Sequence, residues 1–148
     1  MNGTKIKDNF SRIAFDYERY ADIQAQLGDE LLKKFITQKN NLQNILDIGC
    51  GTGKLMAGLK KYFPKSNILG LDISLGMAKI AFQKNLNVLV ADACNVPFKS
   101  GSFNLIISNA VYQWIGDLKM AFSQSRQMLK SKGIFIFSCF GKKTLDEV

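Results

Sequence analysis

The chain of 148 residues contains no histidine. Histidine is the most common general base near neutral pH and the most common metal ligand in proteins. Zinc hydrolases and enzymes with a Ser-His pair are therefore disfavoured. We predict that the chain has no metal site.

Cysteines and long apolar runs are also scarce. Cys50, Cys94 and Cys139 are widely spaced, so they form neither a Cys-x-x-Cys metal pair nor a disulfide framework, and we expect buried, reduced thiols. No apolar run approaches the roughly 18 residues of a membrane span, and residues 1–20 mix charges throughout, unlike a signal peptide. These absences predict a cytoplasmic protein that does not contact a membrane.

Acidic residues are outnumbered by basic ones, 12 against 20, which gives a net charge of +8. The excess is spread along the chain and forms no single block. Two interpretations stay open. The charge is either the ordinary surface of a soluble protein or an attraction for an acidic partner, such as a carrier protein or a nucleic acid.

The first 40 residues predict helices. Residues 21–36 place Ile23, Leu27, Leu31 and Phe35 four apart, which is typical of one helical face, and a shorter helix is expected over 9–17. After residue 44, short apolar runs alternate with helical patterns, which indicates βαβ units and a parallel sheet. The fold class is therefore α/β, of the doubly wound type. Strands are predicted over 45–48, 67–72, 87–91, 103–108 and 134–139, and helices over 54–63, 74–85 and 117–130.

Three residues mark the predicted helix ends in this alternating region. Ser74 and Asp117 are predicted to cap the starts of two helices, because their side-chain oxygens can accept from free N–H groups of the first turn. Gly133 is predicted to stop the helix that Asp117 begins.

Residues 44–54, NILDIGCGTGK, place glycines on alternate positions behind an aspartate. Glycines at this density cost backbone entropy, so we expect a ligand to lie against bare backbone here. A phosphate-binding P-loop would need glycine at position 48 and serine or threonine at position 55, where this chain has Ile48 and Leu55. A dinucleotide fingerprint would need a glycine at Lys54. Both alternatives are disfavoured.

The pattern D-x-G-x-G-x-G over 47–53 resembles the class I S-adenosylmethionine (SAM)-dependent methyltransferases. In that family the loop wraps the methionine part of SAM, and the leading acid lies near its ammonium group. The resemblance implies a Rossmann-like fold, with Asp72 on the ribose, Asp92 and the Ala93 N–H on the adenine edge, and Ile73 and Met77 on its faces. Met77 could equally fill the core. The implied cofactor residues are Asp47, Gly49, Cys50, Gly51, Gly53, Asp72, Ile73, Met77, Asp92, Ala93 and Asn109.

Further stretches narrow the resemblance. VPFKSGSFNLIIS (96–108) resembles the type 11 branch of small-molecule methyltransferases, apart from Asn104, where that branch usually has Asp. Residues 10–32, 108–114 and 137–148 look like those of the biotin-pathway malonyl-[acyl-carrier protein] O-methyltransferases. This implies methyl transfer from SAM to the free carboxylate of a malonyl thioester on an acidic acyl carrier protein. Such a carboxylate is already ionised, so positioning and exclusion of water suffice.

Other functions stay open. The acceptor could be a quinone, a sterol or another small acid, or the chain could bind SAM without catalysis. A nucleic-acid methyltransferase is disfavoured, because Ser108, Asn109, Ala110 and Val111 stand where N-methylating types carry [ND]-P-P-[YF].

Polar and aromatic side chains are expected around the mouth of the pocket. Tyr17, Asn109 and Trp114 are candidates for positioning the acceptor, with core or helix packing as the alternative for the two aromatic residues. The full expected set is Tyr17, Tyr20, Asn109, Tyr112, Gln113 and Trp114.

The resemblance also bears on domain limits. We expect one SAM-binding domain over 1–148, with an N-terminal helical cap (1–40) and an α/β core (44–139). Family members carry two further strands, so the chain looks like an N-terminal portion, with the acceptor-binding residues expected beyond 148. The strand over 134–139 would then be an exposed edge that could pair with a second copy in a homodimer.

Overall fold

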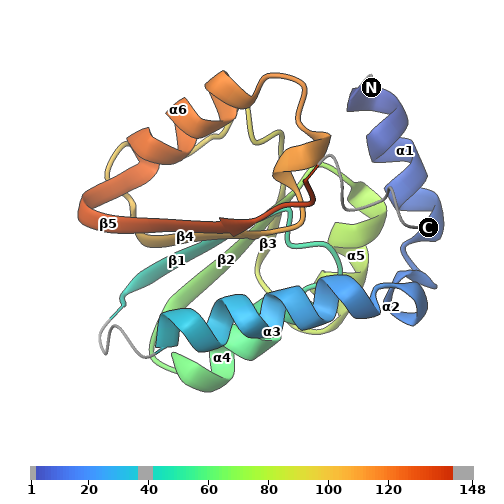
Figure 1. The fold of residues 1–148 in the computed structure, drawn as a ribbon, viewed down its shortest axis with the longest axis horizontal. Helices are drawn as coiled ribbons and strands as arrows, with labels where there is room; N and C mark the ends of the chain where they lie inside the picture. The colour runs from blue at the N-terminus through green and yellow to red at the C-terminus, as the bar shows by residue number, and fades with distance from the viewer. Residues whose placement is uncertain (1–2, 37–41, 142–148) are drawn as a thin grey trace.

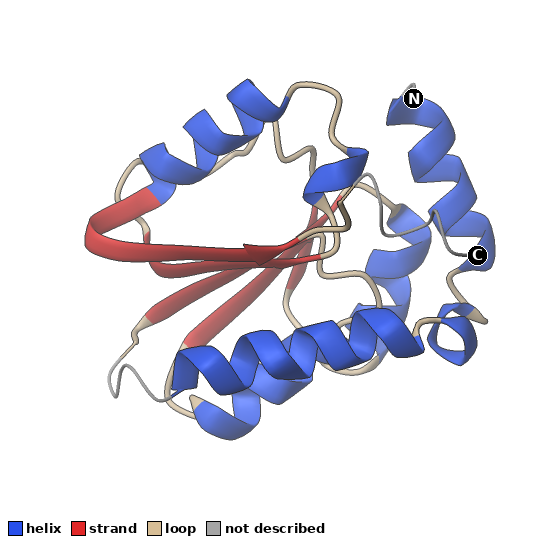
Figure 2. Ribbon diagram, viewed as in Figure 1, coloured by secondary structure: helices blue, strands red, loops and turns tan. Residues whose placement is uncertain are grey.

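The computed structural model describes residues 3–36 and 42–141, and its helices and strands are shown in Figures 1 and 2. Five strands form one parallel sheet in the order β3-β2-β1-β4-β5, which confirms the predicted doubly wound, Rossmann-like α/β fold. The strands are β1 (Asn44–Ile48), β2 (Asn67–Asp72), β3 (Val88–Val90), β4 (Phe103–Asn109) and β5 (Leu129–Ser138). The helices are α1 (Gly3–Ile13), α2 (Tyr17–Tyr20), α3 (Asp22–Ile36), α4 (Lys54–Tyr62), α5 (Leu75–Gln83) and α6 (Leu118–Met128), with a 3₁₀ turn η1 (Tyr112–Trp114).

Helices cover both faces of this sheet (Figure 1). Ile45 of β1 belongs to a core cluster with residues of α3, α4 and α5, whereas Leu46 and Ile48 belong to a second cluster with residues of α6. Burial on both faces explains why the strands are continuous apolar runs. Because side chains alternate along a strand, Asp47 points to the same face as Ile45, under α3. The carboxylate at the end of β1 is therefore covered by the N-terminal helices.

The two predicted helix caps are confirmed. Ser74 Oγ accepts a hydrogen bond from Met77 N–H at 3.2 Å, and Asp117 Oδ1 accepts one from Met120 N–H at 2.9 Å. Each bond satisfies a first-turn donor that has no partner within the helix. Ser74 starts α5 directly after β2, so the beginning of this helix lies at the carboxyl edge of the sheet.

The N-terminal helices differ from the prediction. The expected helix over 9–17 is two helices, α1 and α2, separated by a turn. The face predicted for α3 is confirmed at Phe35, which is buried, and at Leu31, which packs against the core, but it is wrong at Ile23, which is 64% exposed. Gly28 and Leu32 are the other buried residues of this helix. A Cβ on Gly28 would lie 3.2 Å from Asn109 Nδ2, so the helix packs closely at a position without a side chain. A count of apolar residues cannot detect such a contact.

The prediction that Gly133 ends α6 is also wrong. The helix ends at Met128, and Leu129 turns at once into extended backbone that starts β5. Gly133 lies within β5, where the pairing shifts between Phe103–Leu129 and Leu105–Ile134. Lys132 lies between the two shifted pairs, and its backbone is in the left-handed region with a φ of +63°.

As expected, β5 is an edge strand of the sheet in the described residues, with β3 at the opposite edge, and Phe137 of β5 is 39% exposed. Pairing of this edge with a second copy stays a prediction. All three cysteines are free thiols, but only Cys50 is buried; Cys94 is partly buried and Cys139 is exposed just after β5. The expectation of burial is thus wrong for Cys139. No helix within 3–36 or 42–141 is long and apolar enough to cross a bilayer.

Candidate functional site

The loop between β1 and α4 is shaped by glycines in the left-handed backbone region. Gly49, Gly51 and Gly53 have φ values of +71°, +54° and +85°, which side-chain-bearing residues rarely adopt. A Cβ on Gly49 would lie 2.2 Å from a methyl carbon of Val111, so the chain that follows β4 passes directly over it. The Gly49 N–H donates to the Leu71 carbonyl at 2.6 Å. The loop is therefore held against the carboxyl ends of both β2 and β4.

Asp72 ends β2 and connects the loop to the start of α5. Its Oδ2 accepts from Gly51 N–H and its Oδ1 accepts from Ser74 N–H, both at 2.8 Å. Burial raises the pKa of Asp72, and the bonds from these two N–H groups oppose that rise. Each carboxylate oxygen keeps a further lone pair, so Asp72 can hold the local structure and still accept from a ligand.

A cavity of about 410 Å³ opens at the carboxyl ends of the central strands, a size typical of small-molecule sites. Its walls come from the ends of β1 and β2 and from the segments that follow β3 and β4, and α1 contributes Ile6 and Phe10. Residues distant in the sequence therefore meet at the switch point of the sheet. The predicted cofactor residues that line this larger cavity are Gly49, Gly51, Asp72, Ile73, Met77, Asp92, Ala93 and Asn109.

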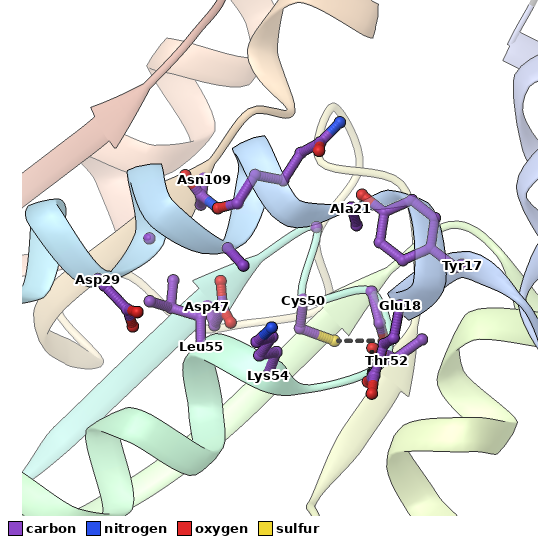
Figure 3. Close-up of a pocket in the computed structure, with 15 residues that line it drawn as sticks. Tyr17, Glu18, Ala21, Asp29, Asp47, Cys50, Thr52, Lys54, Leu55 and Asn109 are labelled. Atoms are coloured by element: carbon purple, nitrogen blue, oxygen red, sulfur yellow. Dashed lines mark hydrogen bonds between the residues drawn. The ribbon is translucent and has the colours of Figure 1, made fainter.

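A smaller cavity of about 80 Å³ adjoins the first, between the glycine loop and the N-terminal helices. Figure 3 shows its lining, with Asp47 and Cys50 from the loop side and Tyr17 and Ala21 from the helices. The two cavities share four lining residues and so form one site. The shared residues are Tyr17, Gly49, Gly51 and Asn109.

Asp47 in the smaller cavity has an unusual environment. The residue is 1% exposed, and neither carboxylate oxygen has a hydrogen-bond partner in the part of the chain that the structure describes. Burial, and after it the charge of Asp72, raise the pKa of Asp47 to about 8. A buried carboxyl group without partners is unfavourable in the folded protein. Its position in a cavity wall therefore suits a ligand that brings positive charge or hydrogen-bond donors.

Cys50 and Gly53 differ from the other predicted loop residues. Cys50 lines the smaller cavity, and burial, together with the charges of Asp47 and Asp72, raises the pKa of its thiol. Gly53 lines neither cavity. A Cβ there would lie 2.1 Å from Leu86 Cδ1, so the absence of a side chain is required for packing. Gly53 was expected to contact the cofactor, but it does not line the wall of either cavity.

An aromatic cluster covers the larger cavity. The Phe10 ring meets the Tyr17 ring at a centroid distance of 6.1 Å and the Trp114 ring at 5.9 Å, both edge-on. Tyr17 and Trp114 line the cavity, as expected for residues at its mouth. Burial, and then the charge of Asp72, raise the pKa of Tyr17, so its phenol stays protonated. Phe10 was not predicted, because its contacts depend on the turn between α1 and α2.

Tyr20, Tyr112 and Gln113 are not brought to either cavity, so their expected place at the pocket mouth is wrong. Tyr20 is 83% exposed, whereas Tyr112 is 2% exposed and its hydroxyl hydrogen-bonds Ser125 Oγ at 2.7 Å. Gln113 donates to the Ala110 carbonyl at 2.7 Å. The tight turn of η1 directs neighbouring side chains to different sides, which a linear motif does not reveal.

Asn109, at the end of β4, joins α3 to β5. Its Nδ2 donates to the Gln24 carbonyl at 2.7 Å, and its Oδ1 accepts from the Ser138 hydroxyl at 2.6 Å. It lines both cavities. Since both polar atoms of its amide already have protein partners, this geometry favours a role in holding the cavity walls.

Glu18 of α2 joins the N-terminal helices to the glycine loop, and no sequence signal indicated it. Its carboxylate accepts from the Thr52 hydroxyl at 2.5 Å and pairs with Lys84, whose ammonium also donates to the Thr52 carbonyl at 3.1 Å. The bonds from Lys84 and Thr52 lower the pKa of Glu18. No local pattern links these three positions, because only the fold brings them together.

The walls of the joined cavities are strongly acidic. This lining favours a ligand with positive charge and disfavours a phosphate group. Among the residues in the described ranges, no group of three or more Cys, Asp or Glu side chains is placed to hold a metal ion. The acids are Glu18, Asp29, Asp47, Asp72, Asp92 and Asp117, against the single base Lys54.

Comparison with known protein families matches residues 46–137, more than half of the chain, to the family described as "Methyltransferase domain". This chain belongs to the methyltransferase domain family. The matched segment contains the glycine loop and the strand ends that form most of the two cavities.

Two relatives of this chain carry names that specify an acceptor. The chain is 35% identical over 150 residues to a malonyl-[acyl-carrier protein] O-methyltransferase of Geobacter sulfurreducens, covering 97% of this chain and 56% of that protein. It is 41% identical over 150 residues to malonyl-[acyl-carrier protein] O-methyltransferase 2 of Ilyobacter polytropus, covering 97% of this chain and 57% of that protein. The chain thus spans a little over half the length of these curated relatives.

The fold is also similar to solved structures. One is a SAM-dependent methyltransferase of Thermotoga maritima, described as a possible histamine N-methyltransferase. It superposes with a TM-score of 0.71 at 26% identity, covering 86% of this chain and 58% of that one.

Proposed function

We propose that this methyltransferase binds SAM in its two joined cavities and transfers the methyl group to the free carboxylate of a malonyl group on an acyl carrier protein. The observation that carries the cofactor assignment is the buried, unpartnered Asp47 inside an acid-lined cavity. SAM has a sulfonium and an ammonium against one carboxylate, so its net charge suits that lining. When bound, SAM supplies a methyl group activated by the sulfonium sulfur.

The adenosine part of SAM fits the larger cavity. Asp72 would accept hydrogen bonds from the ribose hydroxyls, because its oxygens keep free lone pairs. Asp92 and the Ala93 N–H would bind the adenine edge, and Ile73 and Met77 would contact its faces. All five residues line this cavity.

The amino-acid part of SAM fits the smaller cavity. The backbone of Gly49 and Gly51 allows close approach, and Asp47 would pair with the ammonium group. This contact would give the Asp47 carboxylate the partner that it lacks within the protein.

The chain's own residues act on the transfer step by positioning. A malonyl carboxylate is ionised at neutral pH and needs no general base, which agrees with a sequence that contains no histidine. Phe10, Tyr17 and Trp114 cover the larger cavity and would exclude water from it. Asn109 would keep the wall contributed by α3 in place and is itself held by Ser138 of β5, so that donor and acceptor meet in a reactive geometry.

The identity of the acceptor is supported by the names of the two relatives and by the net charge of +8, which suits an acidic carrier protein. We further propose that residues 1–40 act as a helical cap and residues 44–139 as the SAM-binding core of one domain over 1–148. A second candidate is transfer to another small molecule, which the name of the Thermotoga protein favours. SAM binding without transfer is a third.

The test has two stages. Calorimetric titration with SAM should show one binding site per chain, and its absence would contradict the cofactor assignment. Transfer of labelled methyl groups is then compared between malonyl carrier protein, malonyl-CoA and unrelated small acids. Faster labelling of the malonyl carrier protein is expected, and preference for another acceptor would support the second candidate instead.

A further inference from the structure

The segment over 49–91 has an unusual charge distribution. It contains six lysines, and its one acid, Asp72, is buried. The segment therefore carries five of the eight net positive charges, while the rest of the chain has 14 basic and 11 acidic residues. Every one of the six lysines is exposed: Lys54, Lys60, Lys61, Lys65, Lys79 and Lys84.

The lysines lie on α4 and α5 or just after these helices. Lys54, Lys60 and Lys61 belong to α4 and Lys79 to α5, while Lys65 and Lys84 follow the two helix ends. Both helices direct buried residues into the same core cluster, so their outer faces lie on the same side of the sheet. The Lys60 ammonium donates to the Asn85 carbonyl at 3.3 Å, and the Lys84 ammonium donates to the Thr52 carbonyl at 3.1 Å. The end of α5 therefore lies beside α4, and we call this region the α4/α5 surface.

The α4/α5 surface also exposes aromatic side chains. Phe82 of α5 is 73% exposed and Tyr62 of α4 is 52% exposed. Apolar anchors among charged residues are typical of protein interfaces. All the cations here are lysines, whereas bidentate recognition of phosphates in nucleic acids favours arginine. The composition therefore indicates an acidic protein as the partner.

We propose that the α4/α5 surface docks the acidic carrier protein that presents the acceptor, an inference that rests on the proposed function. The surface reaches the catalytic region, since Lys54 and Thr52 line the smaller cavity and Lys84 contacts Thr52. A carrier bound there would bring its thioester arm to the rim of the site. Opposite charges would accelerate the encounter, and added salt would slow it.

The test compares two triple variants with equal charge change. One is Lys60→Glu, Lys61→Glu, Lys79→Glu on the α4/α5 surface. The control is Lys99→Glu, Lys119→Glu, Arg126→Glu, which changes exposed cations near α6 and likewise includes the last turn of a helix. Binding of malonyl carrier protein is measured by biosensor at several salt concentrations, and binding of SAM is measured by calorimetry.

The α4/α5 variant should bind the carrier about tenfold more weakly with a flatter salt dependence, and the control should change less than about twofold. Neither should alter SAM binding, because none of the six changed residues lines a cavity. Equal weakening in both variants, no weakening in either, or tighter binding of an RNA oligonucleotide would overturn the docking surface. Wild-type protein that binds SAM but does not bind the carrier would also overturn the docking surface. Wild-type protein that fails to bind SAM would overturn the proposed function itself.

Discussion

The ends of β1 and β2 each carry a buried aspartate, and the two differ in what surrounds them. Asp72 accepts two backbone hydrogen bonds and connects the glycine loop to α5. Asp47 is more deeply buried, and its carboxylate has no hydrogen-bond partner among residues 3–36 and 42–141. Neighbouring parallel strands thus present the same side chain at one edge of the sheet for different purposes. Asp72 holds the glycine loop and the start of α5 together and can also accept from a ligand. Burial of the Asp47 carboxylate destabilises the folded protein as long as no ligand provides a partner.

Replacing Asp72 should have the largest effect, because it removes support and binding together. We expect Asp72→Ala to lower the free energy of unfolding by about 2–4 kcal/mol, since two buried N–H groups lose a charged acceptor. SAM affinity should fall at least about 100-fold, from the loss of two ribose contacts. Urea denaturation and calorimetry measure the two quantities. Asp72→Asn is the control that retains one acceptor oxygen and should lose less stability; equal behaviour of the alanine variant and wild type would refute this account.

Replacing Asp47 should weaken SAM binding but stabilise the ligand-free protein. We expect Asp47→Asn to weaken SAM binding about 10- to 100-fold through loss of one charged contact. The same change should stabilise the ligand-free protein at pH 8 and above. The folded-state pKa of Asp47 is raised from 3.8 to about 8, so the wild type loses stability as the pH rises through that interval.

The melting temperature of both proteins, measured without SAM from pH 5 to pH 9, checks the stability effect. The advantage of the Asn variant should grow from pH 5 to about pH 8 and then level off. A constant difference between the two proteins would show that Asp47 does not titrate in the folded state.

A third comparison concerns SAM affinity as a function of pH. If Asp47 must be ionised to pair with the ammonium of SAM, affinity should rise by up to about tenfold per pH unit and level off near its pKa of about 8. Asp72, Glu18, Asp29 and Lys54 also face this region, so Asp47→Asn is needed to assign the effect. Calorimetry in buffers of different ionisation enthalpy should detect proton release with wild type only. An affinity that stays flat between pH 6 and pH 8 would contradict the role of Asp47.

The smallest effect is expected at Glu18, a third acid in the smaller cavity whose partners are already in place. Glu18→Gln should reduce SAM affinity only two- to threefold, roughly, because half-exposed ion pairs contribute little. Asp16→Asn, which breaks the exposed pair with Arg19, should leave binding unchanged. SAM affinity of both variants is measured by calorimetric titration. A loss in Glu18→Gln alone indicates that Glu18 acts by joining α2 to the glycine loop, whereas an equal loss in both variants indicates an effect of surface charge.

The parts of this molecule that local pattern determines could be predicted from the sequence. The glycine loop, the acids after successive strands and the caps Ser74 and Asp117 depend on residues close together in the chain. The parallel, doubly wound sheet could be predicted from the alternation of strands and helices, but not the order of its strands. These features account for most of the walls of the larger cavity.

Features that depend on distant contacts could not be predicted. The buried face of α3 is set by packing at Gly28, and Tyr112 enters the core through the turn of η1. Glu18, Thr52 and Lys84 meet only in the folded chain. The role of Gly133 could not be predicted, because a glycine marks an irregular strand start as well as a helix end.

Gly28 lies on the side of α3 that lines the smaller cavity, where the helix packs closely on Asn109. Alanine at this position would gain helix propensity of about 1 kcal/mol. Its methyl carbon would make an ordinary contact with Leu55 at 3.5 Å but would lie too close to Asn109 Nδ2, at 3.2 Å. The Asn109 amide would have to move by a few tenths of an ångström, although hydrogen bonds to Gln24 and Ser138 hold it on both sides. The bare α-carbon of Gly28 therefore lets α3 lie close against the residue that lines both cavities.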